Sequence, residues 1–219
     1  MPSSNHNQIS KIMDLVTALN PQSVLDIGVG FGKYGVLCRE YLELWDGRED
    51  YKKFLRKIDG IEAFTEYLTP LHEFIYNKIY IGNALDVLGQ LDGGYDLVLL
   101  IDVLEHFDKK DGEILIKKIL SRSKGMIISI PKDIGVQEDV FCNPYEQHKA
   151  SWTKKELSRF GEIYSIYDTL SHIVYIGRRD EIKNIKKKHP LKIKIKEVLL
   201  KTPVVVPIYR FIKKLIIRK

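Results

Sequence analysis

A glycine-rich stretch near the start of the chain, VLDIGVGFGKYG at 24–35, has the residue types of a ligand-binding loop. Its apolar half predicts a buried strand, and its glycines predict a tight turn that leads into a helix. Such turns bring backbone N–H groups and a helix N-terminus close to a nucleotide-like ligand. One spacing within it is the G-x-G-x-x-G of dinucleotide sites, formed by Gly30, Gly32 and Gly35.

A second spacing overlaps the first and matches the D-x-G-x-G-x-G loop that binds S-adenosylmethionine, formed by Asp26, Gly28, Gly30 and Gly32. Because the predicted strand ends near Asp26, we expect this carboxylate to face the ligand. A dinucleotide would bring a pyrophosphate against it, whereas S-adenosylmethionine brings a positive sulfonium and a positive ammonium. An acidic neighbour favours such a cation by a few kcal/mol at most. The charge of Asp26 therefore favours S-adenosylmethionine, and the glycines allow close backbone approach.

Two later turns carry residues that suit the rest of such a ligand. In GIEAF, Glu62 ends the second predicted strand, where a carboxylate can accept from both ribose hydroxyls. It follows Gly32 by 30 residues (62 − 32) because a charged insertion at 46–57 lengthens the connection beyond the usual ~20. In GNALD, we expect the Asn83 side chain to accept from the adenine amino group and the Ala84 N–H to donate to the ring.

The elements that must position these residues alternate between strands and helices. Strands are predicted at 23–27, 58–63, 78–81, 95–101, 125–130, 162–167 and 172–177, and helices at 6–20, 33–45, 66–76, 109–122 and 153–160. This alternation predicts a mostly parallel sheet with helices on both faces. The last two strands are joined by only a few residues, near 168–171, which predicts an antiparallel pair close to one edge.

Four motifs, VLDIGVGFG, GIE, GNALD and YDLVLLIDVLEHF, stand in the order and spacing of class I S-adenosylmethionine-dependent methyltransferases. The chain resembles this family over roughly residues 7–179. The resemblance implies an α/β, Rossmann-like sheet of order 3-2-1-4-5-7-6 whose last strand is antiparallel. It also implies S-adenosyl-L-methionine as cofactor, bound by Asp26, Gly28, Gly30, Gly32, Glu62, Asn83, Ala84 and Asp102. The family more often has Asp at the position of Asn83.

The loop after the fourth strand, IDVLEHF at 101–107, resembles the small-molecule branch of the family. It lacks the Asn/Asp-Pro-Pro-Tyr/Phe motif of enzymes that methylate nucleic-acid amino groups, so we expect a small-molecule or sugar-like acceptor. Methyl transfer mostly requires alignment, but a hydroxyl nucleophile also benefits from a base. His106 and His148 are the candidate catalytic residues, and a packing or capping role is the alternative for each. The spacing of the six histidines predicts no metal site.

Two other function classes remain open at this point. A nicotinamide-dependent nucleotide-sugar oxidoreductase would use the dinucleotide spacing and would need a Tyr-x-x-x-Lys dyad. A binding module would keep the S-adenosylmethionine pocket without turnover. The intact glycines and Glu62 favour binding and do not by themselves establish chemistry.

The net charge of +6 is unevenly distributed. Residues 180–219 carry 13 Lys or Arg and 3 Asp or Glu, so they hold +10, and residues 1–179 hold 6 − 10 = −4. We therefore expect a methyltransferase domain at 1–179, no nucleic-acid partner for it, and a separate basic tail at 180–219. With two distant cysteines and no apolar leader, we expect a cytoplasmic protein.

The end of the tail has the pattern of a short amphipathic helix. Five apolar residues share one helical face, namely Ile208, Phe211, Ile212, Leu215 and Ile216, and basic residues lie away from it. Such a helix suits an anionic membrane surface, which would make the protein peripheral at the inner membrane face. The alternative is that this face packs on the domain or on a partner chain.

Overall fold

A computed structural model describes residues 4–44, 50, 53–91, 93–135, 137 and 140–188 of the 219-residue chain. Seven strands form one sheet in the order β3-β2-β1-β4-β5-β7-β6. Their bounds are β1 Ser23–Ile27, β2 Lys57–Glu62, β3 Lys78–Ile81, β4 Leu97–Ile101, β5 Gly125–Pro131, β6 Ile163–Ile166 and β7 Ser171–Gly177. Strand β7 pairs antiparallel with β5 and β6, and the other pairs are parallel. The predicted sheet, its order and its antiparallel last strand are confirmed.

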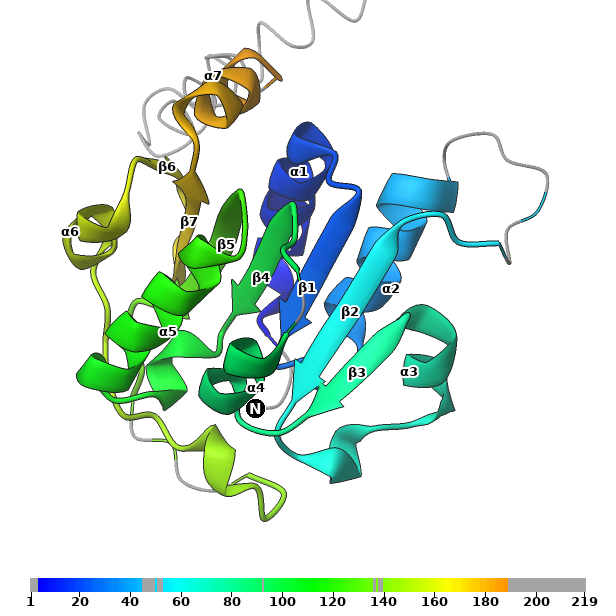
Figure 1. Ribbon diagram of the computed structural model, residues 1–219. Helices are drawn as coiled ribbons and strands as arrows, with labels where there is room; N and C mark the ends of the chain where they lie inside the picture. Colours follow the sequence, from blue (N-terminus) through cyan, green and yellow to red (C-terminus); the bar gives the residue numbers. More distant parts are fainter. Residues whose placement is uncertain are drawn as a thin grey trace, which may run out of the picture.

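Helices cover both faces of this sheet (Figure 1). One face carries α1 Ile9–Leu19, α2 Lys33–Arg39, α3 Pro70–Ile75 and α7 Arg179–Lys188, and the other carries α4 Ala84–Gln90, α5 Lys109–Ser121 and α6 Lys154–Leu157. Because side chains alternate along a strand, β4 sends Leu97 and Leu99 into the first core and Val98 and Leu100 into the second. All four are buried, as the apolar run at 95–101 predicts.

Helix boundaries differ from the sequence-based expectation where turn residues intervene. The predicted helix at 66–76 is divided into a 3-10 turn, η3 (Thr65–Tyr67), and α3, which begins at Pro70. Proline suits the first helical turn, and Thr69 caps it with His72. Helix α4 was not predicted, although Asn83 before it is an N-cap residue and accepts from Leu85 N at 2.9 Å.

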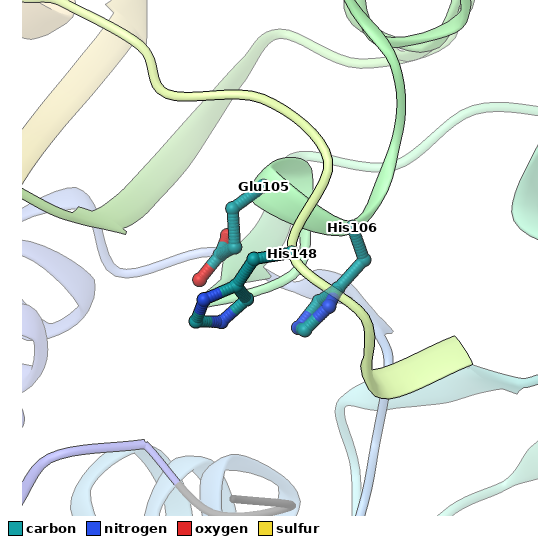
Figure 2. Close-up of side chains that lie close together, drawn as sticks. All are labelled: Glu105, His106 and His148. Carbon is teal, nitrogen blue, oxygen red and sulfur yellow. The ribbon is translucent and has the colours of Figure 1, made fainter. Parts of the chain in front are cut away.

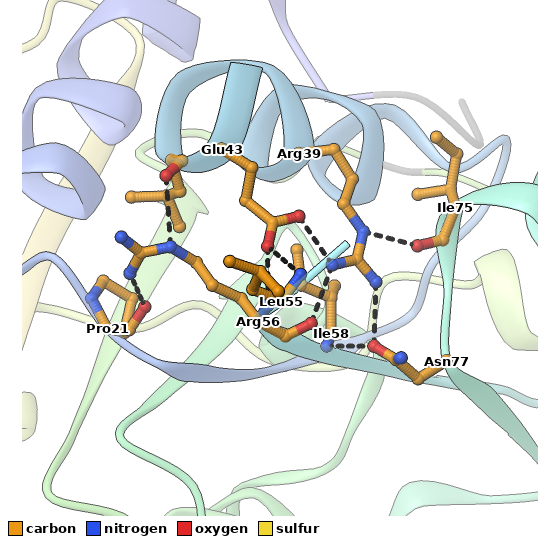
Figure 3. A network of polar contacts seen from close by, with 9 residues as sticks. Pro21, Arg39, Glu43, Leu55, Arg56, Ile58, Ile75 and Asn77 are labelled. Carbon is orange, nitrogen blue, oxygen red and sulfur yellow. Dashed lines mark hydrogen bonds and ion pairs between the residues drawn. The ribbon is translucent and has the colours of Figure 1, made fainter. Parts of the chain in front are cut away.

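A buried ion pair joins α2 to the start of β2 (Figure 3). Arg39 and Glu43 are 2% and 0% exposed, and Nη1 of Arg39 donates to Oε2 of Glu43 at 3.0 Å. The remaining Arg39 donors bind Ile75 O, Arg56 O and the Asn77 side chain, each at 2.8 Å. Oε1 of Glu43 accepts from the backbone N–H groups of Leu55 and Arg56. These bonds hold both ends of the connection in which the charged insertion lies; within 46–57, residues 46–49 and 51–52 lie outside the described residues.

The predicted boundary at 179/180 falls at the beginning of α7. Ile182 and Ile185 of this helix are buried in the core beside α1, and Lys188 Nζ donates to Ala18 O at 2.7 Å. The packed unit therefore extends to Lys188. The amphipathic segment at 208–219 lies outside the described residues. Within the described part of the chain, no helix combines the length and the apolar character needed to span a membrane.

Candidate functional site

A cavity of about 230 Å³ lies at the carboxyl ends of the central strands, where the turns after β1 to β5 meet. This edge is where ligands bind in open α/β sheets. Five carboxylates and two lysines line it, and the carboxylates are Glu62, Asp102, Asp108, Asp111 and Glu146. The acidic excess suits a ligand that carries positive charge and is unfavourable for a pyrophosphate.

The glycine loop has the conformation that its sequence requires. Gly28, Gly30 and Gly32 have φ angles of 73°, 51° and 80°, in the left-handed region. A Cβ at Gly28 would also lie 2.6 Å from Val103 in the loop after β4, so a larger residue would collide there. Gly28 and Gly30 line the cavity, and Gly32 is the N-cap of α2.

Gly30 is held from both sides by buried side chains. Its N–H donates to Oε2 of Glu62 at 2.9 Å, and its carbonyl accepts from Nε2 of His72 at 2.9 Å. The tautomer of His72 follows from Thr69, whose backbone N–H donates to Nδ1 at 3.0 Å. His72 lies on α3, 42 positions after Gly30, and was not predicted from the sequence to belong to the site. No local pattern shows that it reaches the glycine loop.

Glu62 lies at the cavity wall, as predicted for a ribose-binding carboxylate. It is 6% exposed, and besides Gly30 it accepts from Phe64 N at 2.9 Å. Burial raises the pKa of Glu62, and the backbone donors of Phe64 and Gly30 oppose that rise. Each carboxylate oxygen has more than one lone pair, so these bonds leave acceptor capacity toward the cavity.

Asp26 differs from the expectation that its carboxylate faces the ligand. Side chains alternate along β1, so Asp26 points to the opposite face from Leu25 and Ile27, and it is 3% exposed. Its Oδ2 accepts from the hydroxyl of Tyr76 at 2.7 Å, beneath the glycine loop. Burial raises the pKa of Asp26 to about 7, although the Tyr76 hydrogen bond opposes the rise. The negative charge that favours a cationic ligand therefore comes from Glu62 and the other carboxylates of the cavity wall, and not from Asp26.

Asn83 and Ala84 line the cavity at the turn after β3, the place predicted for the adenine. The Asn83 side-chain oxygen is already engaged as the N-cap of α4. An amide oxygen has two lone pairs, so one is left for the adenine amino group, and the amide N–H₂ group is a donor for a ring nitrogen. The contact of Asn83 with the adenine stays a prediction.

Asp102, at the end of β4, has the left-handed φ of 53° that is uncommon outside glycine. Two distant residues hold its carboxylate: Gln8 Nε2 donates to Oδ2 at 2.5 Å and Ser129 Oγ donates to Oδ1 at 3.0 Å. Burial raises the pKa of Asp102, and the hydrogen bonds from Gln8 and Ser129 oppose this. Gln8 lies 94 positions away in sequence, so only the folded chain identifies it as part of the site.

The two predicted catalytic histidines lie side by side. Their ring centroids are 5.1 Å apart, and His106 lines the cavity. Nδ1 of His106 faces the carbonyl of Gln147 at 3.1 Å, and Nδ1 of His148 faces the carbonyl of Ile134. Burial lowers the pKa of His106, which favours the neutral ring near pH 7. The pairing of His106 with His148, 42 positions apart, is a property of the fold.

A Tyr-x-x-x-Lys pair, which the oxidoreductase alternative requires, does occur after the fourth strand as Tyr145 and Lys149. Both residues line the cavity. Tyr145 lies in the 3-10 turn η5 (Pro144–Glu146), whereas Lys149 lies in an irregular segment after it. The pair therefore lacks the single helical face on which residues i and i+4 are neighbours, and the acidic cavity opposes a dinucleotide.

Comparison with known proteins agrees with this architecture. No protein-family model and no curated protein sequence matches the chain. Among solved structures, the N-terminal domain of EvdMO1, with S-adenosylhomocysteine (SAH) and D-fucose, is 17% identical at a TM-score of 0.55 and covers 81% of this chain and 85% of that chain. Magnesium protoporphyrin IX methyltransferase from Synechocystis PCC 6803, with bound SAH, is 15% identical at a TM-score of 0.51. The match covers 78% of this chain and 82% of that chain.

A third similar structure is a protein of Nostoc punctiforme PCC 73102 assigned as an O-methyltransferase, 19% identical at a TM-score of 0.54. The match covers 77% of this chain and 55% of that one, so this chain corresponds to little more than half of its length. At these identities the likeness concerns the fold. The chain has the Rossmann-like fold of class I S-adenosylmethionine-dependent methyltransferases.

Proposed function

We propose that the protein is an S-adenosylmethionine-dependent methyltransferase that methylates a hydroxyl group of a small-molecule or sugar-like acceptor. The observation that carries this proposal is one cavity that combines a left-handed glycine loop, an acidic wall and a histidine with a lone pair directed away from its backbone contact. The fold supports the cofactor class, and the composition of the cavity supports the acceptor class.

The cofactor half of the cavity fits S-adenosylmethionine by its own residues. Gly28 and Gly30 line it in left-handed conformations that favour glycine, and the buried Glu62 and the half-buried Asp102 provide carboxylates for hydroxyl and cationic groups. Asn83 and Ala84 would hold the adenine ring. When bound, S-adenosylmethionine supplies a methyl group activated by positively charged sulfur.

The acceptor half is formed by the polar connection between β5 and α6. Its lining side chains include hydrogen-bond donors and acceptors, one negative charge and one positive charge, and they belong to Asn143, Tyr145, Glu146 and Lys149. The hydroxyl of Tyr67 donates to Oε1 of Glu146 at 3.1 Å, which anchors this connection to the turn after β2. Such a wall suits a polyhydroxylated ligand, and the similar EvdMO1 domain was solved with D-fucose.

His106 is the residue of this chain that would accept the proton of the acceptor hydroxyl. A carbonyl oxygen only accepts, so Nδ1 of His106 carries the hydrogen that it donates to Gln147 O, and Nε2 keeps its lone pair. Burial lowers the pKa of His106, so the ring is neutral and able to accept a proton near pH 7. His148 packs beside it and would fix its orientation.

Calorimetry with S-adenosylmethionine, SAH and NAD tests the cofactor class directly. We expect binding of the first two and none of NAD, and we expect Glu62→Ala to weaken cofactor affinity by ~1–3 kcal/mol through lost hydrogen bonds. NAD binding without S-adenosylmethionine binding would refute the proposal. Release of SAH in the presence of a panel of sugars then separates an enzyme from a binding module without turnover.

A further inference from the structure

Three side chains that can bind a metal converge beside the acceptor half of the cavity (Figure 2). They are Glu105 and His106 in the 3-10 turn η4 (Leu104–His106) and His148 in the connection before α6. One potential ligand atom from each lies within 4.8 Å of the other two. The sequence did not predict a metal site, because these residues come from two segments and lack a recognisable spacing.

Glu105 is the unusual member of this cluster. It is 1% exposed, and its Oε2 has no hydrogen-bond partner among the described residues. Its backbone carbonyl accepts from Lys149 N at 2.8 Å and Ala150 N at 3.1 Å, which holds the two segments together. A buried carboxylate oxygen without a donor is costly unless a cation or a proton satisfies it. Burial raises the pKa of Glu105 well above its usual range, because the charged form is unfavourable away from water.

Both histidines are already in the tautomer that a metal requires. Nδ1 of His106 donates to Gln147 O, and Nδ1 of His148 donates to Ile134 O, so each ring keeps its lone pair on Nε2. Metal-binding histidines commonly donate their second ring N–H to a backbone carbonyl in this way. The outer contacts of a metal site are therefore in place beside Oε2 of Glu105, which has no partner among the described residues.

We propose that Oε2 of Glu105, Nε2 of His106 and Nε2 of His148 bind one divalent transition-metal cation, of the class of Zn²⁺ or Mn²⁺. Two imidazoles and one carboxylate are a ligand set that suits such ions and leaves coordination positions open. Ligands at 2.0–2.1 Å from a tetrahedral ion are about 3.3 Å apart, which the present spacing of no more than 4.8 Å allows after small side-chain shifts. Of the three, His106 lines the cavity, so an ion bound to it would lie beside the cavity.

The role of this cation rests on the proposed function. A hydroxyl oxygen of the acceptor would occupy an open position, and coordination would lower its pKa so that its proton passes to solvent. A sugar with neighbouring hydroxyls would bind through two oxygens. With the cation bound, Nε2 of His106 is a ligand and no longer a base, so the two routes to the same methylation give different outcomes on metal removal.

The test uses tag-free full-length protein, stripped with a chelator and dialysed. Zn²⁺ titration by calorimetry and Mn²⁺ titration by electron paramagnetic resonance should each give one site per chain. Glu105→Gln, His106→Ala and His148→Ala should each weaken binding by about 100-fold or more, as expected for loss of a direct ligand, given the 10–100-fold effect of outer contacts. His6→Ala, at an exposed position, and Glu113→Gln, at a half-buried position on α5, are the matched controls and should bind as the wild type.

Binding that is absent in the wild type, or unchanged in all three ligand variants, would overturn the metal site. The Mn²⁺ spectrum of the wild type decides the matter even if a variant fails to fold, since it needs no variant. S-adenosylmethionine calorimetry on the same samples separates the two proposals. Metal binding without cofactor binding contradicts the methyltransferase and leaves the metal site standing. Cofactor binding without metal binding contradicts the metal site and leaves the methyltransferase standing, and methylation that resists the chelator contradicts the role of the cation in the reaction.

Discussion

Two buried clusters of charged side chains in this protein differ in how completely they are hydrogen-bonded. The Arg39–Glu43 pair engages Nε, Nη1 and Nη2 of Arg39 and both oxygens of Glu43 within the described structure. In the Glu105–His106–His148 cluster, Oε2 of Glu105 has no partner among the described residues, and one potential ligand atom from each residue lies within 4.8 Å of the others. Closed networks stabilise folds, whereas incomplete ones concentrate at functional sites. The comparison separates a structural cluster from a candidate site without reference to sequence similarity.

The closed network should show the largest effect. Arg39→Met should lower the free energy of unfolding by about 3–5 kcal/mol, because it leaves the buried Glu43 carboxylate without its cation. Urea denaturation followed by circular dichroism measures this. The double variant Arg39→Met, Glu43→Leu is the control and should recover most of the loss. A change below about 1 kcal/mol in the single variant would place this pair among ordinary surface ion pairs.

Asp26 is intermediate between the two clusters, since its carboxyl has Tyr76 as a partner and no cation. Its pKa is raised from 3.8 to about 7, so the folded state retains a proton that the unfolded state releases above pH 4. Stability from this group is complete below about pH 4 and declines as pH rises to about 7. Relative to Asp26→Asn, the wild type should lose up to about 4 kcal/mol over that window, about 3 pKa units at 1.36 kcal/mol each.

Urea denaturation of both proteins at several values between pH 4 and 8 measures this difference. Groups common to the two proteins cancel in it. A difference that stays constant with pH would mean that Asp26 has an ordinary pKa in the folded protein. Tyr76→Phe offers a second check, because loss of the opposing hydrogen bond should raise the folded-state pKa of Asp26 and so extend the upper end of the window to higher pH.

His106→Ala tests the incomplete cluster through activity. Turnover should fall by ~10²-fold or more, whether His106 acts as base or as metal ligand, while S-adenosylmethionine affinity should change little. Steady-state rates of SAH release and cofactor calorimetry on the same preparation provide the two measurements. His172→Ala, on β7, is a suitable histidine control. If turnover with a confirmed acceptor is unchanged, His106 is neither a base nor a metal ligand in the reaction, and the protein acts only by aligning the acceptor with the methyl group.

The smallest expected effect contrasts the two glutamates directly. In metal-free protein, Glu105→Gln should change the free energy of unfolding by less than about 1 kcal/mol or raise it, because it removes a buried ionisable group whose Oε2 has no partner among the described residues. Glu43→Gln should be clearly destabilising, since it uncovers the Arg39 charge. Parallel urea titrations at pH 7.5 compare them. Equal losses in both variants would contradict the distinction between the clusters.

The sequence predicted much of the fold because its signals are local. Apolar runs such as the one at 95–101, short turns and the glycines after β1 are read within a few residues, and they led to the observed sheet order through the family resemblance. Helix α4 was missed although Asn83 is a good N-cap, because the seven residues after it are too few to show a clear helical period.

The residue types at the site were also evident in the sequence: the glycines at 28, 30 and 32, Glu62, and the DVLEH loop that contains Asp102 and His106. Only the tertiary structure decided their partners. It turned Asp26 toward Tyr76 and brought Gln8 to Asp102 across 94 positions and His148 to His106 across 42. It also left Oε2 of the buried Glu105 without a donor among the described residues. The physical reason is that periodicity and turn chemistry act over a few residues, whereas burial, hydrogen-bond satisfaction and pKa depend on neighbours that folding alone assembles.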